Sequence, residues 1–358
     1  MDRGQSLTDL SAFHFELPDA RIALRPVEPQ DAARMLVVYP DGRLEDACVR
    51  DLPAFLSPRD VMVFNDTRVI PAALKGIRPA RNAMGTDVPV DVNLVARETD
   101  RDWRALARPG KRLKPGDTLG FEGGLRAEIV DKLGDGEVLL SFSESGDALD
   151  AAIEAVGNMP LPPYIARRRA VDETDRETYQ TSFAGDDAQS VAAPTAGLHF
   201  TQRLLSEIDA AGIIREAVRL HVGLGTFAPL KPSQLESQTL HEEWRQITEP
   251  VAERLNQARR SGAKCVAVGT TSLRTLESSV RTDGVIEPCM GPTDFFLQPG
   301  YSFRATDALV TIFHLPESSL FMLVCALMGT DIMQSAYAHA IAQEYRFYSY
   351  GDACLLLP

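Results

Sequence analysis

Cysteine is scarce in this 358-residue chain, and its distribution excludes two common kinds of framework. The five cysteines are scattered without a CxxC pair: Cys48, Cys265, Cys289, Cys325 and Cys354. Structural zinc sites and disulfide-stapled domains both need clustered or regularly paired cysteines. We therefore expect reduced thiols in a cytoplasmic protein, with neither a zinc site nor a disulfide frame.

Long apolar runs are missing as well. The longest, LFMLVCALMG at 320–329, is about half the length that a bilayer span requires. The opening MDRGQSLTDL has no apolar core after its charges, unlike a secretory leader. We expect no membrane association, and a buried helix or strand at 320–329.

Positive charge is in short supply, because 37 Lys and Arg stand against 50 Asp and Glu, a net charge of −13. This balance argues against a protein that coats nucleic acid nonspecifically. It is compatible with a local basic groove, which the basic runs at 75–78, 111–114 and 167–169 could form. A solvated surface explains each run equally well.

Several catalytic motifs are absent from the sequence. Without GxSxG there is no support for a serine nucleophile. The chain contains neither the GxxxxGK[ST] phosphate loop nor the GxGxxG dinucleotide fingerprint. Its histidines show no HxH, HxxxH or HExxH spacing, so we expect no metal.

The length suggests two domains, and the pattern of apolar residues changes twice along the chain. Residues 61–64 form a continuous apolar run that is typical of a strand buried on both faces. From about residue 73 to 145, short alternating runs are separated by Pro-Gly, Gly-Gly and Asp-Gly turns. We predict a three-layer α/β main domain at 1–72 and 148–358, with a small antiparallel β-barrel domain inserted at 73–147.

The segment VAVGTTSLRTLES at 266–278 is the clearest candidate binding motif. A strand leads through Gly269, Thr270, Thr271 and Ser272 into a helix, and free N–H groups at such a helix start can hold an anion. Simple N-capping is the alternative explanation. Arg274 and Glu277 are spaced to pair along the helix.

Four of the six histidines lie in or beside connections rich in Gly, Pro and Thr: His199, His221, His241 and His314. His199 lies in VAAPTAGLHF at 191–200, and His221 in LHVGLGTF at 220–227. A single histidine of this kind is usually structural, whereas four at element ends favour convergence on a cleft. Imidazoles there could shuttle protons near neutral pH.

Taken together, eleven blocks resemble the S-adenosylmethionine:tRNA ribosyltransferase-isomerase family of queuosine biosynthesis. They are FELP (15–18), VFNDTRVIPA (63–72), GNMPLPPYI (157–165), YQTSFA (179–184), VAAPTAGLHF (191–200), LHVGLGTF (220–227), HEEW (241–244), AVGTTSLRTLES (267–278), TDFFLQPGY (293–301), DALVTIFHLPESSL (307–320) and YRFYSYGDA (345–353). Their common order across nearly the whole chain makes the resemblance specific. It implies an α/β three-layer domain with an inserted β-barrel.

The resemblance also implies a reaction. The ribosyl part of S-adenosylmethionine moves to the aminomethyl group of 7-aminomethyl-7-deazaguanine at the tRNA wobble position and is isomerised, which gives epoxyqueuosine-tRNA and releases adenine and methionine. The implied partners are a tRNA with a GUN-type anticodon and S-adenosylmethionine as a consumed co-substrate, without a metal. We expect a monomer in the cytoplasm.

Site residues follow from the matching blocks. The implied catalytic residues are His199, His221 and His314. The implied S-adenosylmethionine-binding residues are Thr195, Gly197, Gly223, Gly225, Thr226, Gly269, Thr270, Thr271 and Ser272. The implied contacts to tRNA or its base are Asn65, Asp66, Arg68, Arg274, Asp294, Tyr350 and Asp352.

The chain departs from the family pattern at Ala73, Ala228 and Ile312, where the family usually carries hydrogen-bonding side chains. These departures leave two other hypotheses open. One is a divergent paralogue that uses S-adenosylmethionine on a different acceptor. The other is a noncatalytic relative that binds tRNA or a nucleoside.

Overall fold

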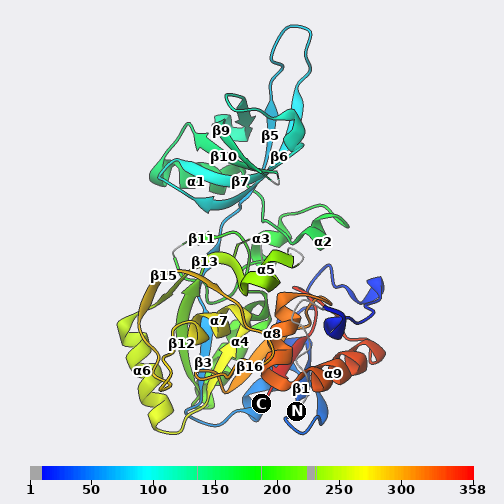
Figure 1. Cartoon of the computed structure of the whole chain (residues 1–358), viewed down its shortest axis with the longest axis vertical. Helices are drawn as coiled ribbons and strands as arrows, with labels where there is room; N and C mark the ends of the chain where they lie inside the picture. Colours follow the sequence, from blue (N-terminus) through cyan, green and yellow to red (C-terminus); the bar gives the residue numbers. More distant parts are fainter. Residues whose placement is uncertain (1–9, 135, 187, 224–229, 231) are drawn as a thin grey trace. The chain divides into compact units, whose positions relative to one another are not determined.

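The computed structural model describes residues 10–134, 136–186, 188–223, 230 and 232–358 (Figure 1). Its chain divides into two units. The first comprises Met1–Thr67, Thr181–Gly185 and Pro194–Pro358, and the second comprises Arg68–Gln180 and Asp186–Ala193. The chain therefore leaves the first unit and returns to it more than once.

A mixed nine-stranded sheet forms the centre of the first unit. Its strands, in spatial order, are β15 (Cys289–Phe295), β13 (Thr239–Ile247), β12 (Ile214–Leu220), β3 (Val61–Asn65), β14 (Cys265–Val268), β16 (Ala308–Ile312), β17 (Ala353–Leu356), β1 (Arg34–Val38) and β2 (Leu44–Cys48). The four central neighbours β12, β3, β14 and β16 run parallel to one another. β17 is antiparallel to β16 and parallel to β1.

The helices of this unit connect and cover the sheet. They are α4 (Gln202–Ala210), α5 (Pro232–Ser237), α6 (Glu249–Arg260), α7 (Gly269–Glu277), α8 (Ser319–Met328) and α9 (Thr330–Ala342), with the 3₁₀ turns η1 (Leu10–Phe13), η2 (Asp19–Arg21), η3 (Gln30–Ala32), η4 (Val49–Phe55) and η7 (Thr195–His199). Among the described residues, no single helix is long and apolar enough to cross a membrane. α8 and α9 meet that test only as a pair, which is bent by 116°.

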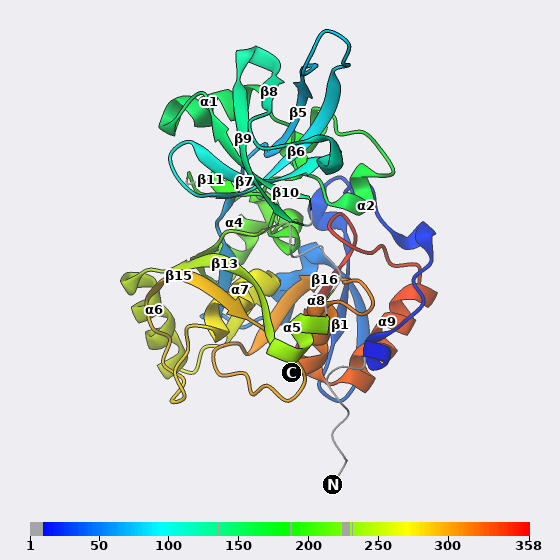
Figure 2. The same ribbon diagram turned by 45° about the horizontal axis from the view of Figure 1, so that its top comes forward.

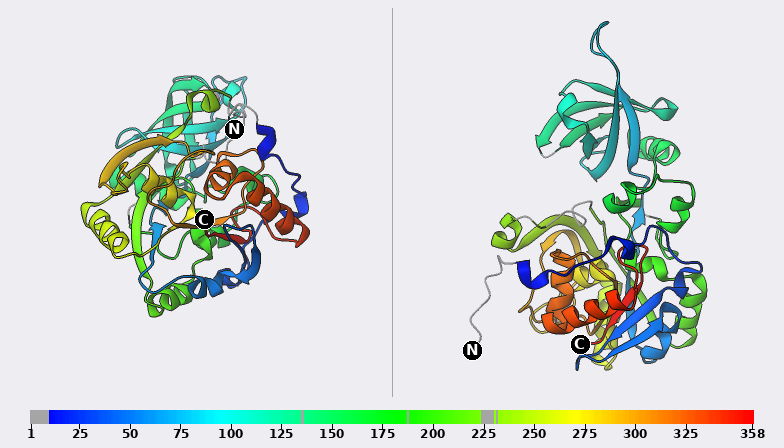
Figure 3. Two further views of the ribbon diagram at one scale, coloured as in Figure 1. Left: turned by 60° about the horizontal axis from the view of Figure 1, so that its bottom comes forward. Right: turned by 90° about the vertical axis from the view of Figure 1, so that its right-hand side faces the viewer.

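The central strands are apolar without alternation because both faces of the sheet are covered. On one face, Met62 and Phe64 of β3 share a core with Leu204 of α4. On the other face, the ring of Phe313 after β16 lies 5.3 Å from that of Tyr337 in α9. Figure 3 shows α4 and the α8–α9 pair on opposite sides of the sheet. This arrangement confirms the predicted three-layer fold.

A closed six-stranded antiparallel barrel forms the core of the second unit (Figure 2). Its strands, in order around the barrel, are β10 (Glu137–Phe142), β7 (Asp102–Arg108), β6 (Val88–Arg97), β5 (Ala73–Arg78), β8 (Thr118–Phe121) and β9 (Arg126–Gly134). Buried and more exposed residues alternate along β5, β7 and β10, as a sheet with one face in a core requires. The barrel confirms the prediction made from the alternating runs.

Shorter elements complete the second unit. They are η5 (Gly110–Arg112), η6 (Glu122–Gly124), α1 (Gly146–Val156), α2 (Pro163–Ala166), α3 (Thr174–Thr178) and a two-stranded parallel pair of β11 (Ala188–Ser190) with β4 (Arg68–Val69). Ala73 begins β5, where its backbone exchanges two hydrogen bonds with Asn158.

Candidate active site

Polar residues gather at the edge of the sheet where the four central parallel strands end. His221 follows β12, Asn65 ends β3, Gly269 follows β14, and His314 lies just beyond β16. In open α/β sheets, ligands bind at this carboxyl edge of the strands. The sequence predicted chemistry at each of these strand ends, and the sheet order places them along one edge.

The connection after β3 is tied to the end of β12 through Asn65. This fully buried amide donates to the Leu220 carbonyl over 2.9 Å and accepts the Leu220 N–H over 3.1 Å. It also accepts the Thr67 N–H. Asn65 therefore holds two strand ends in register, and its side chain is used within the protein.

His221 is held by two neighbours. Its Nδ1 lies 3.0 Å from the Thr67 hydroxyl, and its ring stacks on Trp244 with centroids 4.8 Å apart and an interplanar angle of 14°. The imidazole is half-buried. A fixed imidazole that retains access to solvent suits proton transfer to a bound substrate.

Asp66 forms an ion pair with Arg219 of β12. Arg219 Nε and Nη2 donate to the two carboxylate oxygens over 2.9 and 2.8 Å, and both side chains are about one-fifth exposed. A bidentate pair of this kind fixes the carboxylate in one orientation. It places a charged group beside Thr67 at the same edge.

α7 begins in the interior of the unit, so the polar residues at its start are buried. Gly269 adopts φ +86°, which favours glycine, while Thr270, Thr271 and Ser272 are at most 8% exposed. The Ser272 hydroxyl donates to the Val268 carbonyl, whereas the Thr271 Oγ1 has no hydrogen-bond partner among the described residues. Because buried hydroxyl groups in proteins are usually hydrogen-bonded, the Thr271 hydroxyl is a candidate ligand-binding group.

Arg274, one turn further along α7, forms a buried ion pair with Glu243 of β13. Glu243 also accepts the Gly223 N–H over 2.9 Å, so one carboxylate joins LHVGLGTF to the α7 helix. Nη2 of Arg274 has no hydrogen-bond partner within the part of the chain that the structure describes. The expected pairing of Arg274 with Glu277 along the helix is wrong: Glu277 accepts the backbone N–H groups of residues 304–306 and the Tyr301 hydroxyl instead.

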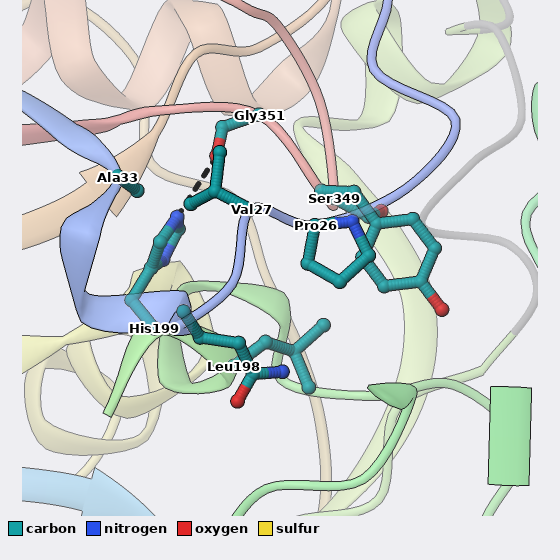
Figure 4. Close-up of a pocket in the computed structure, with 9 residues that line it drawn as sticks. Pro26, Val27, Ala33, Leu198, His199, Ser349 and Gly351 are labelled. Carbon is teal, nitrogen blue, oxygen red and sulfur yellow. Dashed lines mark hydrogen bonds between the residues drawn. The ribbon is translucent and has the colours of Figure 1, made fainter. Parts of the chain in front are cut away.

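η7 brings His199 to a small hollow that is also lined by Pro26 and Tyr350. Figure 4 shows the His199 ring directed at the Gly351 carbonyl, with Nε2 3.0 Å from that oxygen. Nδ1 lies 3.2 Å from the Ala196 carbonyl. The hollow has room for little more than one water molecule, so it is far smaller than a pocket that encloses a drug-sized ligand.

Gly197 permits the tight packing of η7. A Cβ at this position would lie 2.6 Å from Cζ of Phe183, closer than real contacts allow. Pro194 and Gly197 are both buried, and Thr195 between them is half-buried. The turn is thus a buried structural feature that also presents His199 to the hollow.

Tyr350 and Asp352 belong to the connection that precedes β17. Tyr350 is buried and lines the hollow beside His199. Asp352 accepts the backbone N–H groups of Arg34 and Arg346 over 3.1 and 2.7 Å. Its carboxylate therefore shapes the backbone next to the hollow.

His314 lies in the interior. Its Nε2 is 2.9 Å from the Thr311 hydroxyl, and its backbone N–H donates to the Tyr337 hydroxyl. Burial lowers the pKa of His314 to about 3, because an imidazolium there would lose its hydration. The side chain is neutral at physiological pH.

Comparison with known proteins places this chain in a family. A family model described as "Queuosine biosynthesis protein" matches residues 10–356. The chain belongs to the queuosine biosynthesis protein family.

Relatives in this family match over all or nearly all of their length. A Hyphomonas neptunium protein named S-adenosylmethionine:tRNA ribosyltransferase-isomerase is 65% identical over 98% of this chain and all of its own. A Maricaulis maris protein of the same name is 55% identical over 97% of this chain and 98% of its own. The crystal structure of the Thermotoga maritima S-adenosylmethionine tRNA ribosyltransferase is 33% identical, with a TM-score of 0.55 over 97% of this chain and all of that one.

Several residues expected from the family pattern are exposed. Arg68 is exposed in β4, and Asp294 is exposed in β15. His241 is exposed within β13 rather than at an element end, so the expected convergence of four histidines does not include it. Gly225 and Thr226 lie outside the described residues, as does Ala228, while Ile312 is buried at the end of β16.

Three residues of this family member carry interactions at the edge that sequence reasoning missed: Thr67, Glu243 and Trp244. Glu243 and Trp244 stand in the HEEW block, so the motif was visible but the roles of its residues were not. No group of three or more His, Cys, Asp or Glu side chains within the described ranges is placed to hold a metal ion.

Proposed function

We propose that this chain is an S-adenosylmethionine:tRNA ribosyltransferase-isomerase. It transfers and isomerises the ribosyl moiety of S-adenosylmethionine onto 7-aminomethyl-7-deazaguanine at the wobble position of a tRNA with a GUN-type anticodon. The products are epoxyqueuosine-tRNA, adenine and methionine. The observation that carries this proposal is 65% identity, over nearly the whole chain, to a relative of that name.

The reaction needs a base and an acid. The sulfonium of S-adenosylmethionine acidifies the adjacent 5′-carbon, from which a base removes a proton, and adenine leaves readily only when it is protonated. His221 is the best placed of the three predicted histidines for proton transfer, because Thr67 and Trp244 fix a ring that is only half-buried.

The other two histidines suit positioning roles. Both ring nitrogens of His199 face carbonyl oxygens, so the ring ties η7 to the connection before β17. His314 is neutral and buried, and its bond to Thr311 fixes the end of β16. Both histidines would fix the backbone around the site, while His221 exchanges a proton with the bound substrate.

The start of α7 is the proposed site for the carboxylate of the methionine moiety. The positive end of a helix dipole attracts an anion, and among the described residues the Thr271 Oγ1 and the Arg274 Nη2 of α7 have no hydrogen-bond partner. Arg274 thus moves from the predicted tRNA contacts to this anion site. Gly269, Thr270 and Ser272 form the same turn, and Thr195, Gly197, Gly223, Gly225 and Thr226 complete the proposed S-adenosylmethionine-binding set.

The remaining predicted residues are proposed contacts to tRNA or its base. Arg68 and Asp294 are exposed and can reach RNA directly, whereas Asn65 and Asp352 act through the backbone that they hold. Asp66 and Tyr350 would face the base. We further propose a monomeric cytoplasmic enzyme, in which the inserted barrel domain at 73–147 is part of the larger second unit.

Adenine release tests the function directly. The protein is incubated with S-adenosylmethionine alone, with unmodified tRNA, and with tRNA that carries 7-aminomethyl-7-deazaguanine, and free adenine is measured by chromatography. We expect adenine only in the last sample. Release with a different acceptor would instead identify a divergent paralogue, and binding of the modified tRNA without release would identify a noncatalytic relative.

Two matched histidine variants test the proposed proton transfer. His221→Gln should lower kcat by about 10²–10⁴-fold, the range for loss of a general acid or base. His241→Gln removes an exposed histidine from the neighbouring strand and should leave kcat unchanged. Equal rates for the two variants would remove His221 from the mechanism.

A further inference from the structure

The connection between β7 and β8 of the barrel displays three exposed cations on a fixed backbone. Lys111, Arg112 and Lys114 are exposed, while Leu113 between them is 1% exposed and anchored in the barrel core. The name "loop patch" refers to these three cations, Lys111, Arg112 and Lys114.

Two further cations hold this backbone in place. Nζ of Lys132 in β9 donates to the carbonyls of Gly110 and Leu113 over 2.9 and 3.3 Å. Nη2 of Arg81 donates to the Arg112 carbonyl over 2.8 Å. A loop whose backbone is fixed in this way presents its charges without a further backbone ordering cost when a partner binds.

The carboxylate that lies against the loop is already neutralised. Asp117 is 9% exposed, accepts Nε and Nη2 of Arg81 over 2.7 and 2.6 Å, and accepts the Lys114 N–H. These bonds lower the pKa of Asp117. The Asp117 carboxylate thus shapes the loop, but it does not neutralise the charges of Lys111, Arg112 and Lys114.

We propose that the loop patch binds the phosphate backbone of the tRNA substrate. A protein of net charge −13 repels a polyanion at long range, so it needs a local concentration of cations to hold RNA. Lysine and arginine side chains on a short turn contact phosphates without reading bases, so the patch supplies affinity rather than sequence choice. This inference rests on the proposed function, which makes tRNA the partner.

Binding of an in-vitro transcript of a tRNA with a GUN anticodon tests the loop patch. K111A/R112A/K114A should weaken Kd by about 10- to 100-fold near 0.1 M salt and reduce the slope of log Kd against log salt by about 2–3. kcat at saturating modified tRNA and the KM for S-adenosylmethionine should not change. K111R/R112K/K114R, which keeps all three charges, should bind like the wild type.

A matched triple variant controls for net charge. R50A/R260A/K264A removes three exposed cations from the other unit, two of them next to the amino end of β14, and should leave Kd within about twofold. Equal weakening of tRNA binding in K111A/R112A/K114A and R50A/R260A/K264A would overturn the proposal. Loss of binding in K111R/R112K/K114R, or wild-type binding by K111A/R112A/K114A, would also overturn it. If the wild type neither binds tRNA nor releases adenine, the proposed function itself fails.

Discussion

The buried ion pair between Glu243 and Arg274 offers the sharpest test of how the edge is held together. Both side chains are about 5% exposed, and Glu243 also accepts the Gly223 N–H. Glu243→Gln keeps the shape and an acceptor oxygen for Gly223, but it leaves the Arg274 guanidinium buried without a counter-charge. Removal of one partner from a buried pair costs about 3–5 kcal/mol in the free energy of unfolding.

Urea unfolding followed by tryptophan fluorescence measures this cost. The chain has two tryptophans, Trp103 in the barrel and Trp244 in the main sheet. The indole nitrogen of Trp103 has no hydrogen-bond partner among the residues that the structure describes, so Trp103→Phe provides a background in which fluorescence reports on the first unit alone. Glu243→Gln in that background should unfold at a clearly lower urea concentration.

Two controls separate buried charge from other effects. Asp283→Asn breaks an ion pair with Arg281 whose side chains are half-exposed, and it should cost no more than about 1 kcal/mol. Adding Arg274→Met to Glu243→Gln removes both charges and should recover part of the lost stability. The reasoning is refuted if Glu243→Gln costs no more than Asp283→Asn, or if the double variant is less stable than the single one.

Three further predictions concern packing and titration. The folded-state pKa of His314, about 3, lies below the free value of 6.5, so between these pH values only the unfolded chain binds the extra proton. The free energy of unfolding of the wild type should therefore fall by up to about 1.4 kcal/mol per pH unit as pH drops below 6.5. His314→Gln should flatten that slope in pH-dependent urea unfolding, and an unchanged slope would contradict the assignment. Gly197→Ala should lower the free energy of unfolding by about 1–3 kcal/mol through overpacking. Gly120→Ala should cost less, because its new Cβ meets nothing closer than 3.9 Å. Equal thermal midpoints for the two variants would argue against tight packing of η7. A thiol reagent at pH 8 should react quickly with Cys48 and Cys289 alone, because burial raises the pKa of the other three thiols. Rapid labelling of a third cysteine, detected by mass spectrometry, would contradict the burial of these three thiols.

Local patterns predicted the elements correctly where packing follows a simple period. The apolar run at 61–64 became the buried strand β3, and the alternating runs from 73 onward closed into the barrel. Such periods are local because the backbone alone determines which side chains share a face. The partner of a polar side chain is not local, so Arg274 was expected to pair with Glu277 three residues away but pairs with Glu243, which is 31 residues away.

The sequence by itself determined the family, the α/β-plus-barrel architecture and the strand ends that carry polar residues, because these depend on motif order and on short-range periodicity. Only the tertiary structure decided what those residues do. Strand order put His221 beside Thr67, from positions 154 residues apart, and burial made His314 a neutral group. Hydrogen-bond partners, burial and pKa depend on which distant segments meet, and that is settled when the sheet assembles.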